Sequence, residues 1–215
     1  MGERQGSDVI KYWPEESREP AQLVIDTYGE PHEATESVLI WHGVGPWKRL
    51  VASKAFYHHD FPAPHIDAVE SVIDYKVPAE YFTPLAEYDG SVIVERTAGE
   101  VSARCHDEQA NSLALNLMND IVTGEKTPDE ARKYYAKEFL DFRRKKPTPY
   151  MDKLQFEPGH GTADPDSRLL TDEDLERAVE EGKAGERPVA NRRLQGCRRE
   201  KDGHVLISPA AQATS

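Results

Sequence analysis

The sequence predicts an α+β fold in which an antiparallel sheet of about five strands packs against a C-terminal antiparallel helix pair on one face. Short apolar runs separated by turn residues fill the first half of the chain. Two segments with helical spacing of apolar residues follow them. The end of the chain is polar and predicts a largely irregular tail.

The predicted strands form two hairpins and a single strand between them. Each hairpin has apolar runs on both sides of a glycine-containing turn. The middle strand alternates apolar with charged residues, as a half-buried strand does. In chain order, the strands are expected at residues 37–41, 47–53, 69–77, 91–96 and 100–105.

The predicted helices are marked by their ends. A short helix is expected to begin at Pro20 and to end at Gly29, because proline suits the first helical turn and glycine accepts a left-handed cap. The helix pair is expected within residues 106–146. Its first helix should end at Gly124, and its second should begin at Thr127 with a capping box.

The chain of 215 residues, 38% of them hydrophobic, is long enough for one core with extensions. Residues 1–19 are expected to be a flexible arm, residues 20–156 a single α+β domain, and residues 157–215 a polar tail that is disordered or docked on a partner. Within the tail, a short acidic helix after Thr171 and the apolar patch at residues 204–207 are segments of the kind that dock on another surface.

Charge and cysteine content restrict the class of protein. With 39 acidic and 27 basic residues the formal charge is -12, which opposes binding to nucleic acid or to an anionic membrane. The N-terminus has no apolar run typical of a signal peptide or anchor. The two cysteines are Cys105, in the expected core region, and Cys197, in the polar tail. They do not suggest a disulfide framework, so we expect a reducing compartment and therefore a cytoplasmic protein.

A histidine-rich segment at residues 58–67 carries the candidate metal ligands. Neutral imidazole and carboxylate groups are suitable ligands for zinc and other divalent metals. Neighbouring histidines in an extended chain point in opposite directions, so only one of His58 and His59 is expected to join His65 and Asp67. The alternative is a surface loop with ordinary histidines. No cofactor other than such a divalent metal is predicted.

Aromatic residues around the same segment give a second candidate site. Trp41, His42 and Trp47 could line a groove for a ligand or a partner, although tryptophans in this pattern also suit a core. Phe61, with Phe56 and Tyr57, could form one wall of a small-ligand pocket.

Cys105 precedes a predicted helix N-terminus, which can lower the pKa of a thiol and make it a nucleophile. The alternative is a small buried strand residue followed by a helix cap. Sequence alone does not place a histidine beside this thiol.

These observations favour an intracellular binding or accessory protein that engages a protein partner through its tail or an exposed loop. The alternatives are a small metal-dependent enzyme that uses residues 58–67 and a small-ligand-binding domain. The residues do not decide between an enzyme and a binding protein, and they do not indicate an oligomeric state.

Overall fold

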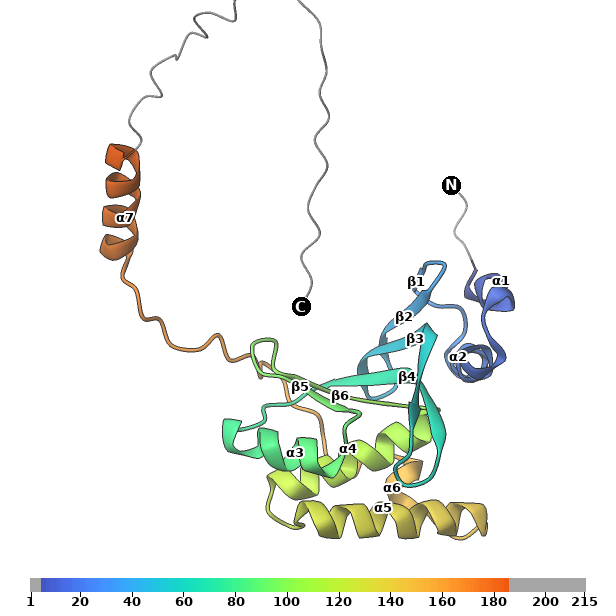
Figure 1. Cartoon of the computed structure of the whole chain (residues 1–215). Helices are drawn as coiled ribbons and strands as arrows, with labels where there is room; N and C mark the ends of the chain where they lie inside the picture. The colour runs from blue at the N-terminus through green and yellow to red at the C-terminus, as the bar shows by residue number, and fades with distance from the viewer. Residues whose placement is uncertain (1–4, 186–215) are drawn as a thin grey trace, which may run out of the picture. The chain divides into compact units, whose positions relative to one another are not determined.

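The computed structural model describes residues 5–185 and has the expected α+β fold, divided into two units (Figure 1). The described part of the first unit ends at Asp166 and contains the sheet and most of the helices. The second unit begins at Ser167 and contains helix α7 (Asp172–Gly185).

The sheet of the first unit has six described strands in the order β1-β2-β3-β4-β6-β5, and every neighbouring pair is antiparallel. The strands are β1 (Glu33–Ala34), β2 (Val38–Val44), β3 (Trp47–His59), β4 (His65–Asp74), β5 (Val92–Glu95) and β6 (Glu100–Cys105). The strand beyond the expected five is β1, a two-residue edge strand that pairs with β2.

The β3–β4 hairpin is longer than the sequence predicted. Residues 56–66 have the proline and histidine content of a loop, yet β3 continues to His59 and β4 begins at His65. The pairing shifts register between Ala52 and Tyr57 and then resumes. Such an irregularity bends a strand without ending it, which composition does not reveal.

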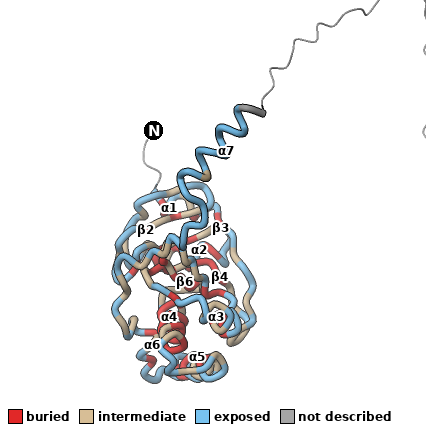
Figure 2. Tube along the Cα trace, turned by 90° about the vertical axis from the view of Figure 1, so that its left-hand side faces the viewer, coloured by how far each residue is buried: buried red, intermediate tan, exposed pale blue. Residues whose placement is uncertain are grey.

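The helix pair is present as α4 (Glu108–Val122) and α5 (Pro128–Arg143). The Asp107 side chain accepts a 2.8 Å hydrogen bond from the Ala110 amide and caps α4. Thr127 and Glu130 form the expected capping box at the start of α5. Helix α4 packs on the sheet and is buried over most of its length (Figure 2), whereas α5 packs against α4 and α3 (Phe82–Tyr88). A short turn, η2 (Ala79–Tyr81), precedes α3.

Residues 5–19, expected to be a flexible arm, belong to the first unit and contain α1 (Gly6–Val9) and η1 (Ile10–Tyr12). Helix α2 (Glu15–Tyr28) begins before Pro20 and includes it. Ile10 and Trp13 are buried, and the Trp13 indole donates a 2.9 Å hydrogen bond to a backbone carbonyl. The burial of these two residues anchors a segment whose average composition is that of a polar arm.

The first unit also continues beyond residue 156, where the sequence placed the start of the tail. After α6 (Pro149–Asp152), the Gly159 amide donates a 2.8 Å hydrogen bond to the Asp74 carbonyl. The Thr162 hydroxyl donates a 2.6 Å hydrogen bond to the Gly99 carbonyl. Hydrogen bonds to backbone carbonyls of the sheet region hold this segment, so its low apolar content does not predict where it lies.

Helix α7 lies in the second unit, where the sequence predicted an acidic helix. Thr171 caps it, because its hydroxyl accepts a 3.1 Å hydrogen bond from the Asp174 amide. Leu175 and Val179 are exposed on this helix. The predicted apolar patch at 204–207 lies outside the described residues. Within residues 5–185, no helix has both the length and the apolarity needed to cross a membrane.

Candidate metal centre

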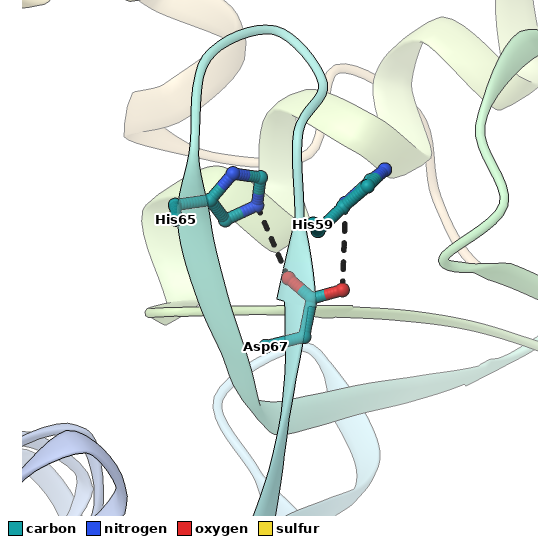
Figure 3. A group of neighbouring side chains, drawn as sticks. All are labelled: His59, His65 and Asp67. Atoms are coloured by element: carbon teal, nitrogen blue, oxygen red, sulfur yellow. Dashed lines mark ion pairs between the residues drawn. The ribbon is translucent and has the colours of Figure 1, made fainter.

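Three of the residues predicted as metal ligands meet at the end of the β3–β4 hairpin (Figure 3). His59 on β3 is the cross-strand partner of His65 on β4, so their side chains lie on the same face of the hairpin. Asp67 follows His65 by two residues and therefore shares that face. The register of one hairpin thus brings His59, His65 and Asp67 together.

The ligand atoms of this triad have separations that suit one small cation. His65 Nε2 lies 3.1 Å from Asp67 Oδ1, and His59 Nδ1 lies 3.4 Å from Asp67 Oδ2. All the ligand atoms of the group lie within 4.8 Å of one another. Tetrahedral zinc with bonds of about 2.0 Å holds its ligand atoms about 3.3 Å apart. The two His–Asp separations are close to this value.

Two atoms of the triad are buried without a hydrogen bond. His65 Nε2 and Asp67 Oδ1 are close, but neither has a hydrogen-bond partner of acceptable geometry. Asp67 is only 2% exposed. A buried polar atom without a partner is costly, and most such atoms in proteins are paired. A cation between these two atoms would satisfy both.

The surroundings of the two imidazoles fix the orientation of their rings. His65 Nδ1 lies 2.9 Å from the Ala63 carbonyl, which accepts a hydrogen bond and so places the ring proton on Nδ1. His59 Nε2 lies 3.8 Å from Asp89 Oδ1. A carbonyl or carboxylate beside the far nitrogen of a ligating histidine is the usual support in metal sites.

Ser91 connects the triad to Asp89. Its hydroxyl donates a short hydrogen bond to Asp67 Oδ2 and lies 3.3 Å from His59 Nδ1. Its amide donates a 2.8 Å hydrogen bond to Asp89 Oδ1. Ser91 and Asp89 come from the α3–β5 turn, far from the hairpin in sequence. Sequence reasoning missed both, because no local pattern links that turn to the histidines.

The electrostatics of the triad favour positive charge. Burial alone would lower the pKa of His65, but its interactions with Asp67 and Cys105 outweigh burial and raise the pKa to about 11. His65 without a metal is therefore an imidazolium at neutral pH, paired with Asp67. Burial also raises the pKa of Asp89. A divalent ion would replace the proton of His65 as the positive charge beside Asp67.

A cavity of about 510 Å³ lies beside the triad and shares His65 with it. Its wall is mostly apolar and is formed by the end of the hairpin, the start of α4 and the second half of α5. The lining residues used below are Ile66, Cys105, Ala110, Tyr135, Phe139 and Arg143. A cavity of this size can hold a small organic molecule.

The fourth predicted ligand, His58, lies outside the triad. Its side chain is exposed, and its ring meets the edge of Phe56 with centroids 5.9 Å apart. It therefore follows the alternation of an extended strand, in which His58 and His59 point to opposite faces.

Trp41 and Trp47 are core residues in the structure, buried to 0% and 2% exposure. The Trp41 indole donates a 2.9 Å hydrogen bond to the Gly29 carbonyl. The Trp47 indole donates a hydrogen bond of the same length to Glu108 Oε1. His42 is exposed beside them and pairs with Glu33 at 2.6 Å.

Phe61 lies next to the triad, with its ring centroid 6.3 Å from that of His59. It packs against Tyr135 at 5.1 Å, and the Arg132 guanidinium carbon lies 3.8 Å from its ring centroid. Phe56, Tyr57 and Phe61 are not among the residues that line the cavity. The aromatic part of the cavity wall instead includes Tyr135 and Phe139 of α5, which the sequence analysis did not propose for it.

Cys105 ends β6 and borders both His65 and the cavity. Burial raises the pKa of its thiol, although His65 acts in the opposite direction. The thiol therefore stays protonated at neutral pH, which does not favour the nucleophilic role.

Comparisons with protein-family models, curated proteins and solved structures gave no match to this chain. The fold and the triad together define an α+β protein with a candidate mononuclear metal centre, and function is argued from that centre.

Proposed function

We propose that the protein is a divalent-metal-dependent enzyme of the mononuclear class, in which His59, His65 and Asp67 hold one ion. The observation that carries the proposal is the convergence of the three side chains: their ligand atoms lie within 4.8 Å of one another and include two buried atoms, His65 Nε2 and Asp67 Oδ1, that have no hydrogen bond of acceptable geometry. The hydrogen bond from His65 Nδ1 to the Ala63 carbonyl adds support, because it turns Nε2 toward Asp67, where a metal ion would take the place of the Nε2 proton.

The composition of the triad favours chemistry over a purely structural ion. Structural zinc sites use four protein ligands, whereas catalytic sites use three and keep a position for water or substrate. Two histidines and one carboxylate also serve iron and related metals. Because His65 borders the cavity, an ion held there would lie close to a small molecule inside it. Such an ion polarises a bound carbonyl or activates a water molecule.

Metal uptake by the untagged chain tests this proposal. Titration calorimetry with Zn²⁺, Mn²⁺ and Fe²⁺ should show one ion bound per chain. His59→Ala and His65→Ala should each weaken binding by at least about tenfold. His58→Ala is the matched control, since His58 is adjacent in sequence but exposed outside the triad, and it should bind as the wild type does. Equal affinities in all four proteins would contradict the proposal.

A second function, binding of a protein partner in the cytoplasm, is favoured by the second unit. Leu175 and Val179 are one turn apart on α7 and are both exposed. Leu169 and Leu170 are exposed just before the helix. Exposed apolar residues within an acidic segment suit a partner that offers an apolar groove with a basic rim.

Site-specific photo-cross-linking tests this second function in the cells that make the protein. A photoreactive residue at Val179 should give one dominant cross-linked partner. The same residue at Glu181, on the opposite side of α7, is the control and should give little product. Equal products from both positions, or none from Val179, would argue against docking through this helix.

A further inference from the structure

The cavity beside His65 combines an apolar wall with a cationic group. Ile66, Ala110 and Phe139 provide apolar surface, and Tyr135 is buried at its inner side. Arg143, in the last turn of α5, also lines the cavity. An apolar pocket with a few placed polar groups is typical of small-molecule sites.

Arg143 differs from Arg144 and Lys146, two of the basic residues that follow it. Arg144 and Lys146 lie 3.5 Å and 3.6 Å from Asp141 Oδ1 and so have a carboxylate partner. Arg143 forms no ion pair or hydrogen bond within the described part of the chain. Its guanidinium carbon instead lies 4.8 Å from the ring centroid of Phe139. The cavity therefore contains a guanidinium whose donors are available to a ligand.

The one carboxylate that lines the cavity forms a helix cap and no ion pair with Arg143. Asp107 lines the cavity, but one of its oxygens accepts the 2.8 Å hydrogen bond that caps α4. His106 and His65 are the other titratable nitrogen groups of the lining. Arg143 is the only lysine or arginine among the residues that line the cavity, so it is the group best suited to bind a carboxylate there.

We propose that this cavity binds a small aromatic carboxylate, with the carboxylate on Arg143 and the ring between Phe139 and Ile66. Arginine recognises a carboxylate with two parallel hydrogen bonds, and an aromatic ring fits a wall of apolar and aromatic side chains. The volume of about 510 Å³ suits a molecule of one or two rings. The role of this molecule as a substrate rests on the proposed function, but its binding does not.

Binding of matched acids and amides tests the inference. Phenylacetate and 3-phenylpropionate would be titrated into the full chain and followed by amide chemical shifts, with the primary amides as neutral counterparts. The acids should bind at least about tenfold more tightly than the amides. R143Q should remove this preference while amide binding persists. R144Q is the matched control, because Arg144 pairs with Asp141 and does not line the cavity.

Equal affinities for acid and amide, no saturable shift with either, or an unchanged preference in R143Q would each overturn the inference. Ala110→Leu places a larger side chain in the cavity and should weaken the binding of acids and amides alike. This variant therefore checks that both bind in the cavity. H59A separates the two proposals, because His59 belongs to the triad but not to the cavity lining. Metal uptake should be weakened in H59A while the acid preference remains. Unchanged metal uptake by H59A would contradict the proposed metal centre but not the proposed carboxylate site.

Discussion

His65 Nε2 lies 3.1 Å from Asp67 Oδ1 at the end of the β3–β4 hairpin, and neither atom has a hydrogen bond. The two residues are separated by one position on the same strand, so the pleat alone places them on one face. The cross-strand partner His59 completes the group. The candidate centre is therefore a property of one hairpin and its register.

The helix-pair core gives the first prediction. Leu117 on α4 is 0% exposed, so Leu117→Ala should lower the free energy of unfolding by about 2–5 kcal/mol, as other buried truncations do. Leu140 on α5 is 47% exposed, and Leu140→Ala should cost much less. Urea denaturation measures both. An unchanged midpoint for Leu117→Ala would contradict the assigned core.

The docking of residues 157–166 gives the second prediction. Gly99 has a positive φ of 68°, and a Cβ there would lie 2.2 Å from the Thr162 carbonyl carbon. Gly124 has a φ of 79° with no atom near its Cβ position. Gly99→Ala should therefore destabilise the protein more than Gly124→Ala, in which only the backbone strain of about 1 kcal/mol is added.

Hydrogen exchange identifies the cause of that difference. The Gly159 amide donates to the Asp74 carbonyl, so it should exchange faster in Gly99→Ala than in Gly124→Ala. Equal stabilities and equal exchange rates in the two variants would show that the segment does not pack on Gly99.

A charge cluster on the sheet gives a pH-dependent prediction. Glu100 accepts hydrogen bonds from Arg49 at 2.8 Å and pairs with Lys48 at 2.9 Å. Burial alone would raise the pKa of Glu100, but these two partners outweigh it and lower the pKa below the ordinary 4.5. The folded state thus favours the ionised form. This stabilisation is present above pH 4.5 and is lost as the pH falls through the lowered pKa.

Glu100→Gln should therefore be less stable than the wild type at neutral pH, and the gap should shrink as the pH falls below about 4.5. Glu87→Gln, at an exposed position, serves as the control and should show a small gap at every pH. Thermal unfolding from pH 7 to pH 3 measures both. If the stability difference between Glu100→Gln and the wild type grew as the pH fell, the lowered pKa of Glu100 would be contradicted.

The fold class and the helix pair could be predicted because their signals are local: the Gly124 stop and the Thr127 capping box act within a few residues. The triad was predictable only in part. His59, His65 and Asp67 could be named from their chemistry, but the register that joins them depends on an irregularity between Ala52 and Tyr57.

Other features could not be predicted because they depend on tertiary contacts. Ser91 and Asp89 reach the triad from another turn, and Arg143 is notable only because Asp141 pairs with its neighbours. The burial of Trp13 and the hydrogen bond from the Gly159 amide hold two segments in place, although the polar composition of these segments predicts no fixed structure.

The central claim is that His59, His65 and Asp67 hold one divalent ion, and X-ray absorption of the zinc-loaded full chain tests it most directly. The account predicts nitrogen and oxygen ligands at about 2.0–2.1 Å, with the outer-shell scattering of two imidazoles that falls to one in His65→Ala. A sulfur shell at about 2.3 Å, or a spectrum that is unchanged in His65→Ala, would contradict it.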